Sequence, residues 1–186
     1  DLKITQNESV AFVGESGAGK TTLVNAICSI LDIDEGEFLV NDIPIEKINK
    51  SSYRSKVGYI TQEPTIFNAD IFNNVSFWDE RTPENLEKFW KVIQMCSLEK
   101  FIEDLPNQEK ELLGNNGINI SGGQKQRISI ARELYRDVDL LIMDEATSAL
   151  DSETEKEIKD SIESLQGKVT IVSIAHRLST IRNADV

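Results

Sequence analysis

One run near the start of the chain has the residue types and the spacing that bind phosphate. Its glycines allow backbone N–H groups to point inward around an anion, and the helix expected to follow adds the positive end of its dipole. Lys20 can reach the outer phosphates of a nucleotide, and the Thr21 hydroxyl is placed for Mg²⁺. The run therefore predicts a site for a phosphate chain with its metal ion. Its residues are Gly14, Glu15, Ser16, Gly17, Ala18, Gly19, Lys20, Thr21 and Thr22.

Two adjacent acids follow an apolar run later in the chain. Asp144 and Glu145 come directly after Leu140 to Met143, a run typical of a strand buried on both faces. Successive side chains of a strand point to opposite faces, so the two carboxylates can hold different roles. Asp144 can reach Mg²⁺ through water. Glu145 is the candidate for polarising a water molecule that attacks the phosphate chain.

A second glycine-containing group opens a predicted helix. Ser121, Gly122, Gly123 and Gln124 place a serine and two glycines at a helix N-terminus, which makes a second anion site. One chain does not need two such sites for one triphosphate. These four residues resemble the signature of the nucleotide-binding domain of ABC transporters, and Ile120 precedes them where that family usually has leucine.

The resemblance implies a nucleotide, a metal ion and two kinds of partner. The nucleotide is ATP and the ion is Mg²⁺. Two such domains pack head to tail, and the signature of one covers the γ-phosphate held by the loop of the other. The partner is thus a second nucleotide-binding domain, which we expect to be an identical chain. Transmembrane domains are expected to be fused upstream, so that the chain works at the cytoplasmic face of a membrane.

Further residues match the family position by position. Gln62 resembles the Q-loop glutamine that contacts Mg²⁺ and the attacking water. The run Ser148 to Asp151 looks like the D-loop, which crosses the dimer interface. His176, the only histidine, resembles the switch histidine that contacts the γ-phosphate. Asn115 departs from the pattern, since exporters commonly carry glutamate there.

The roles implied by the residues and the resemblance form three groups. The catalytic residues are Glu145, His176 and Lys20. The metal ligands are Thr21, Gln62 and Asp144, of which the last acts through water. The remaining nucleotide contacts are the loop from Gly14 to Thr22, Gln62, the signature Ser121 to Gln124, and Asp151. We expect in-line attack of water on the β–γ bond, with the developing charge stabilised by these groups.

Strands and helices that alternate along the chain must position these residues. Strands are predicted at Ser9 to Val13, Gly58 to Thr61, Leu140 to Met143 and Val169 to Ile174, and Glu37 to Val40 is predicted to form a hairpin. Helices are predicted at Lys20 to Leu31, from Thr82, from Ser97, at Gly122 to Tyr135 and from Ser152 to Gly167.

This alternation predicts an α/β fold with a mainly parallel sheet. The resemblance makes it a P-loop NTPase (RecA-like) core, with a helical insert subdomain that carries the ABC signature at its end. We expect one domain over residues 1–186, cut from a longer chain. Residues 1–62 and 121–186 are assigned to the ATP-binding core and residues 63–120 to the helical subdomain.

Composition limits the classes of partner. The net charge of -12 opposes binding of nucleic acid through a broad basic face. No apolar run reaches the length of about 18 residues that a membrane-spanning helix needs. Cys28 and Cys96 lack metal-site spacing and are expected to be buried free thiols. Six acids between Asp151 and Glu163 are interpreted as a solvated helix face.

Three classes of function remain to be separated. The exporter-like segment Phe67 to Val75 favours outward transport, with a lipid or lipid-linked sugar as the cargo. The alternative is a soluble ABC-class ATPase of DNA repair or translation. The separation of Lys20 from Ser121 leaves no room for the long coiled coil of the repair enzymes. The third class, a regulatory domain that only binds ATP, is opposed by the complete set of motifs.

Overall fold

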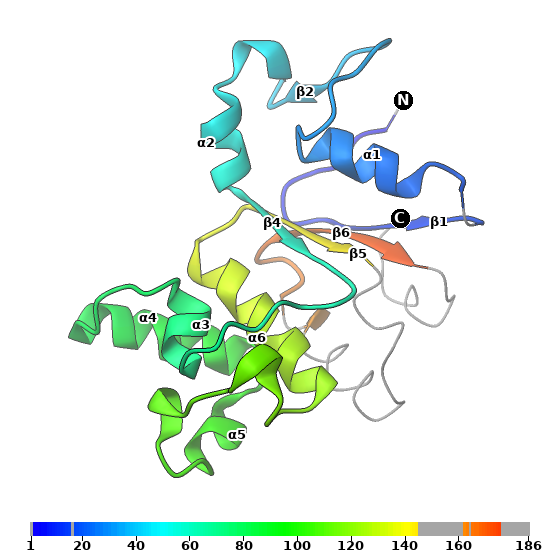
Figure 1. Cartoon of the computed structure of the whole chain (residues 1–186). Coiled ribbons are helices and arrows are strands. Elements are labelled where there is room, and N and C mark those ends of the chain that lie inside the picture. The colour runs from blue at the N-terminus through cyan, green and yellow to red at the C-terminus, as the bar shows by residue number, and fades with distance from the viewer. Residues whose placement is uncertain (1, 16, 145–161, 164, 176–186) are drawn as a thin grey trace.

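The sheet at the centre of the structure has four parallel strands in the order β1-β6-β5-β4 (Figure 1). The computed structural model describes residues 2–15, 17–144, 162–163 and 165–175. Because the strands run in the same direction, their carboxyl ends meet at one edge of the sheet, where open α/β sheets bind ligands. The strands are β1 (Ser9–Val13), β4 (Val57–Ile60), β5 (Leu140–Asp144) and β6 (Thr170–Ala175).

Polar side chains explain where several helices begin. Asn49, Asp70 and Thr82 each accept a hydrogen bond from a backbone N–H of the first turn that follows, and Pro83 occupies the first helical position after Thr82. A two-stranded antiparallel hairpin, β2 with β3, lies apart from the main sheet. These elements are α1 (Lys20–Ile27), β2 (Leu39–Val40), β3 (Ile43–Pro44), α2 (Lys50–Ser55), α3 (Ile71–Ser76), α4 (Pro83–Met95), α5 (Glu99–Glu103) and α6 (Gly122–Tyr135).

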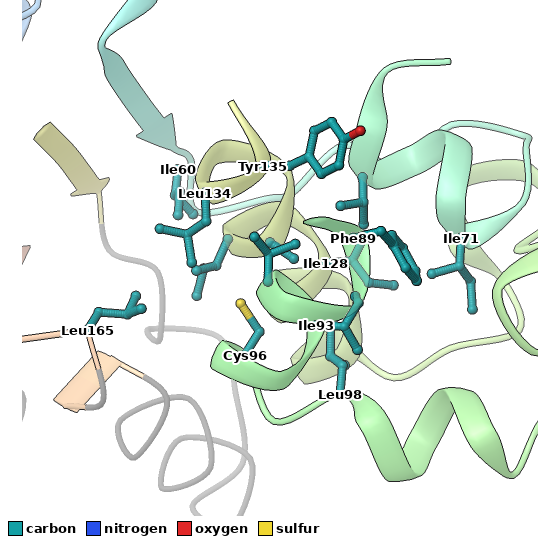
Figure 2. Close-up of a cluster of buried hydrophobic side chains, with 14 of the residues drawn as sticks. Ile60, Ile71, Phe89, Ile93, Cys96, Leu98, Ile128, Leu134, Tyr135 and Leu165 are labelled. Atoms are coloured by element: carbon teal, nitrogen blue, oxygen red, sulfur yellow. The ribbon is translucent and has the colours of Figure 1, made fainter. Parts of the chain in front are cut away.

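Helices α1 and α6 cover opposite faces of the sheet (Figure 1). On one face, Val24 of α1 packs in a cluster with Ile142 and Val172. On the other, α6 joins a larger cluster with the sheet and with α3 and α4. Figure 2 shows this cluster, in which the labelled residues are Ile60, Ile71, Phe89, Ile93, Cys96, Leu98, Ile128, Leu134, Tyr135 and Leu165.

The larger cluster runs across the predicted subdomain boundary. Ile71 and Phe89 come from the segment 63–120, whereas Ile128 and Leu141 belong to the predicted core, and all four side chains are buried together. Helices α3, α4 and α5 do lie within 63–120. The division into two subdomains stays a prediction, because one hydrophobic core serves both parts.

The prediction of a helix beginning at Ser97 is wrong. Ser97 has a left-handed backbone (φ 54°), donates its N–H to Gln94 O, and is followed by Leu98, which donates to Ile93 O. This pair of bonds is the Schellman arrangement that ends a helix, so Ser97 closes α4. Helix α5 begins two residues later, at Glu99, after the fully buried Leu98.

A Schellman arrangement also ends helix α1 earlier than predicted. We predicted helix to Leu31, but α1 ends at Ile27. Ser29 is left-handed (φ 54°), and Ser29 and Ile30 donate backbone bonds to Ala26 O and Asn25 O. Ile27, Ile30 and Leu31 recur at helical spacing, although the helix has already ended.

The other predicted elements agree with the structure, whereas α2 and α3 were not predicted from the sequence. The four sheet strands match their predicted positions to within one residue at each end, and Glu37 to Val40 does supply one strand of a hairpin. Helix α6 has the predicted bounds. Cys28 and Cys96 are buried free thiols. The predicted helix from Ser152 lies mostly outside the described residues.

Two further observations concern the described part of the chain. None of its helices has the length and apolar character needed to cross a bilayer. The segment that leads into α6 contains one short 3-10 turn at Asn115–Gly117, in which Asn116 and the flanking Gly114 have positive φ. Lys125 of α6 donates to Asn116 O at 2.7 Å and fixes this turn to the helix.

Candidate functional site

The loop between β1 and α1 has the backbone that a phosphate-binding loop requires. Gly17 and Gly19 adopt left-handed φ values of 84° and 88°, which other residues reach only with strain. Gly19 is the N-cap of α1, and no side chain of the described residues caps this helix. The first N–H groups of α1 therefore face an exposed loop of small residues and can bind an anion.

The Lys20 ammonium lies inside this loop. Its Nζ donates to Gly14 O at 2.8 Å and to Glu15 O at 2.9 Å. These two bonds hold the charge at the mouth of the loop and leave one ammonium hydrogen for a phosphate oxygen. Thr21 and Thr22 follow in the first turn of α1, and both are exposed. The loop residues predicted from the sequence thus lie together, with Ser16 outside the described residues.

Helix α2 holds the far end of α1. The Tyr53 hydroxyl donates to Ile27 O at 2.7 Å, and the Arg54 guanidinium donates to Ser29 O at 2.6 and 3.2 Å. Burial raises the pKa of Tyr53 to about 12, so its hydroxyl stays protonated as a donor. These bonds satisfy carbonyls that the helix end leaves unpaired, and they fix the axis along which Lys20 is presented.

Asp144 ends β5 at the same edge of the sheet. Its carboxylate oxygen Oδ2 accepts a hydrogen bond of 2.9 Å from the hydroxyl of Tyr59 in the neighbouring strand β4. Tyr59 is paired with Ile142, two residues before Asp144, so both side chains lie on the α1 face of the sheet. Burial and then this bond raise the pKa of Tyr59 above its ordinary range. The hydrogen bond from Tyr59 thus orients the Asp144 carboxylate on the face of the sheet that α1 and the phosphate loop cover.

Gln62 follows the carboxyl end of β4 by two residues and is exposed. The strand order places β5 next to β4, so Gln62 and Asp144 leave adjacent strands at one edge. The side-chain Nε2 of Gln126, in α6, donates to Thr61 O at 3.4 Å, directly before Gln62 in the chain. The predicted metal ligands Gln62 and Asp144 therefore come from the carboxyl ends of adjacent strands, and Thr21 belongs to the helix that covers the same face as Asp144.

The signature residues form a capping box at the start of α6. Ser121 Oγ accepts from Gln124 N at 3.2 Å, and Ser121 N donates to Gln124 Oε1 at 2.8 Å. This arrangement is a structural role that any helix start can have. Among the described residues, however, no group accepts from the N–H of Gly122 or Gly123. The Ser121 hydroxyl also keeps its own hydrogen, so an anion-binding surface remains.

The structure brings some predicted site residues together and separates others. The phosphate loop, Gln62 and Asp144 share the carboxyl edge of the sheet. The signature does not join them from the α1 side, because α6 covers the opposite face. The remaining predicted residues, Glu145, Asp151 and His176, lie outside the described residues.

Sequence reasoning missed Tyr59, Tyr53 and Arg54. A hydroxyl in the middle of an otherwise apolar strand was the available signal for Tyr59. Tyr53 and Arg54 gave no such signal, because their acceptors are backbone carbonyls far away in the sequence. All three act by holding other site residues in place.

The residues present fit a magnesium–nucleotide group. Left-handed glycines, an uncapped helix N-terminus and the Lys20 ammonium supply the surroundings that phosphate oxygens need. Asp144 and Gln62 supply oxygen atoms, the ligand type that Mg²⁺ prefers. The site is therefore suited to a nucleoside triphosphate with its metal ion.

Comparisons with known proteins give a consistent picture. A family model described as "ABC transporter" matches residues 1–148. An ATP-dependent lipid A-core flippase of Desulfotalea psychrophila is 43% identical over 100% of this chain, which spans 32% of the flippase. ATP-binding cassette sub-family B member 5 of Mus musculus is 40% identical, and the chain spans 15% of it. The solved structure of a bacterial Atm1-family ABC exporter with ATP bound matches with a TM-score of 0.84 and 33% identity, over 99% of this chain and 32% of that one.

Proposed function

Because this chain belongs to the ABC transporter family, we propose that it is the ATP-hydrolysing domain that drives transport across a membrane in a longer protein. One observation carries the proposal. The phosphate loop with its bonded lysine and the Tyr59-bound Asp144 share one sheet edge, whereas the signature stands on the opposite face, where no described group accepts from the N–H of Gly122 or Gly123. The phosphate loop with Asp144 forms half of one ATP site, and the signature forms half of a second ATP site.

The residues of the chain mainly position and neutralise. Lys20 and the first N–H groups of α1 bind the phosphates, and Thr21, Gln62 and Asp144 hold the metal ion, Asp144 through water. A bound Mg²⁺ would offset the negative charge of the phosphate oxygens. Glu145 orients the attacking water, and His176 stabilises charge on the transferred group.

A second copy of the chain completes each site. Ser121, Gly122 and Gly123 of one copy cover the γ-phosphate that Lys20 of the other copy holds, and Asp151 contacts the same interface. The opposite placement of α1 and α6 supports this arrangement, because one copy cannot close its own signature over its own loop. ATP favours the closed pair and its products favour the open pair, which couples hydrolysis to movement.

The transmembrane domains belong to the same longer protein. The chain spans about a third of the flippase and of the exporter that it matches, so most of such a protein lies outside it. We place the chain at the cytoplasmic face of the membrane. The flippase among its relatives favours a lipid or a lipid-linked sugar as the cargo. The relatives do not favour the soluble repair or translation classes.

Phosphate release by the full-length protein tests the proposal. Glu145→Gln removes the carboxylate beside Asp144 but keeps its shape, so we expect ATP binding to persist and turnover to fall by about 10² or more. Glu103→Gln, in the exposed part of α5, is the matched control and should hydrolyse ATP normally. Turnover of the Glu145 variant close to that of the control would contradict the assignment.

A further inference from the structure

Helix α6 carries a polar stripe that is buried. Gln126, Ser129 and Arg132 are only 1%, 6% and 5% exposed. Burial of such side chains costs free energy unless they are hydrogen-bonded, and most of all for the charged guanidinium. The partners of Arg132 therefore show what the stripe stabilises.

The guanidinium of Arg132 is bonded to the segment that follows Gln62. Nε donates to Asn74 O at 2.6 Å, and the two terminal nitrogens donate to Thr65 O at 2.8 Å and Asn74 Oδ1 at 3.2 Å. The group also lies over the rings of Phe67 and Phe77, at 4.8 and 5.5 Å from their centroids. These aromatic faces add favourable cation–π contacts.

Asn74 organises the same segment from within. Its Oδ1 accepts from Phe67 N at 2.8 Å, and its Nδ2 donates to Phe67 O and Asp70 O, both at 3.0 Å. Arg132 therefore bonds both to Asn74, which holds the segment 67–70 in its turn, and to Thr65 before that turn. Asp70 in turn caps α3 and pairs with Arg81. Loss of the Arg132 hydrogen bonds would therefore alter the position of the whole segment from Thr65 to α3.

Gln62 lies between two attachments to α6. Gln126 reaches Thr61 O on one side, at 3.4 Å, and Arg132 reaches Thr65 O on the other, at 2.8 Å. We infer that Arg132 is a positioning residue for Gln62, which keeps the glutamine side chain at the metal site in register with the signature at the start of the same helix. This inference rests on the metal role proposed above for Gln62.

Lysine cannot replace arginine in this role. A guanidinium is a planar fork that can bond three acceptors in fixed directions, whereas an ammonium is a compact point charge. Arg132→Lys should therefore keep the buried charge but weaken the hydrogen bonds that hold residues 61–65, called here the Gln62 loop, against α6. We expect the Mg²⁺ concentration that gives half-maximal ATP turnover to rise about tenfold, as for other residues that orient metal ligands.

Magnesium titrations of ATP turnover by the full-length protein test the inference. Arg127→Lys is the matched control, because Arg127 is also a buried arginine of α6 but donates to Ser97 O, away from the Gln62 loop. Its half-maximal Mg²⁺ concentration should not change. A purely structural role of Arg132 would lower the thermal midpoint and leave the Mg²⁺ dependence as it is.

A double-mutant cycle with Gln62→Ala shows whether Arg132 acts through Gln62. The tenfold rise should disappear when Arg132→Lys is added to Gln62→Ala, because the ligand to be positioned is already gone. A rise of equal size in both backgrounds, or no rise in either, would overturn the inference and leave the proposed function intact. If Gln62→Ala alone has normal Mg²⁺ dependence, the proposed metal role of Gln62 falls, and the inference with it.

A milder variant covers the case in which Arg132→Lys does not fold. Phe77→Leu removes one aromatic face from the guanidinium and changes a side chain that is half-exposed, so folding should survive. It should raise the half-maximal Mg²⁺ concentration in the same direction but less. An unchanged value in the folded Phe77 variant would contradict the inference.

Discussion

The hydrogen bond between Tyr59 and Asp144 joins two strands at the point where the metal ion is expected. Tyr59 donates from β4 to a carboxylate oxygen of β5, and the raised pKa of Tyr59, caused first by burial, keeps the hydroxyl protonated. A hydrogen bond to a charged acceptor is stronger than one between neutral groups. Tyr59 therefore fixes the direction in which Asp144 presents its other oxygen.

Removal of this hydroxyl should affect chemistry more than folding. In Tyr59→Phe the Asp144 carboxylate loses its orienting donor, and we expect ATP turnover of the full-length protein to fall about tenfold. Tyr135→Phe is a close match, since Tyr135 also donates to an aspartate, Asp79, at 3.0 Å, on the α6 side of the sheet. Comparable losses of phosphate release in both variants would mean that the Tyr59 bond has no special role.

At this scale the sequence predicted residue types better than contacts. Lys20 and Asp144 were recognisable, because a motif or a strand end marks each of them. The bond from Tyr59 to Asp144 was not, because the two residues are 85 positions apart and their pairing depends on strand register. Arg132 was missed for the same reason, since its acceptors, Asn74 in α3 and Thr65 before that helix, are 58 and 67 positions away.

Between elements, β4 approaches α6 closely at Gly58. A methyl group added at Gly58 would lie 3.0 Å from Glu133 Cβ and 3.1 Å from Leu141 Cδ1, so only glycine fits without movement of the neighbours. This contact buries the Glu133 carboxylate, whose partner is Arg136 at 2.6 Å. Burial raises the pKa of Glu133, although Arg136 and Arg132 oppose the shift.

The raised pKa of Glu133 makes the stability of the folded state depend on pH. The folded state binds the Glu133 proton more tightly than the unfolded state, so this group's contribution to stability is fully present below its ordinary value of 4.5 and is lost as pH rises through the folded pKa. Glutamine imitates the protonated form at every pH. Glu133→Gln should therefore unfold at higher denaturant concentration than the unaltered chain at pH 7, and the difference should vanish near pH 4.5.

Urea unfolding of this chain across that pH range is the measurement. Glu103→Gln, at an exposed position of α5, should show no such pH-dependent gain. A Glu133 variant that is less stable than the unaltered chain at pH 7 would show that the Arg136 pair outweighs the burial of the carboxylate.

At the scale of elements, periodicity and caps predicted most of the structure. The strands of the sheet and α6 follow from apolar runs and from Ser121 as a cap. The ends of α1 and α4 did not follow, because each helix is closed by a serine, Ser29 or Ser97, in a left-handed conformation that glycine usually adopts. Without glycine at these positions, the sequence gives little sign of a Schellman turn.

For the whole molecule, the main consequence is that the two predicted anion-binding surfaces belong to different faces of one sheet. Helix α1 and the phosphate loop lie on one face, and α6 with the signature lies on the other (Figure 1). The sequence alone suggested this separation only through the family resemblance. The packing of the two helices supplies an independent physical reason for a second copy.

Cross-linking across that interface is the most direct measurement of the central claim. Ala18 in the phosphate loop and Ser121 in the signature are both exposed, whereas the native Cys28 and Cys96 are buried and should not react. In the full-length protein that carries Ala18→Cys, Ser121→Cys and Glu145→Gln, we expect Mg-ATP to promote an oxidative cross-link between two copies. Each single-cysteine protein should lack this cross-link. A double-cysteine protein that stays uncross-linked with Mg-ATP, or cross-links only within one copy, would contradict the account.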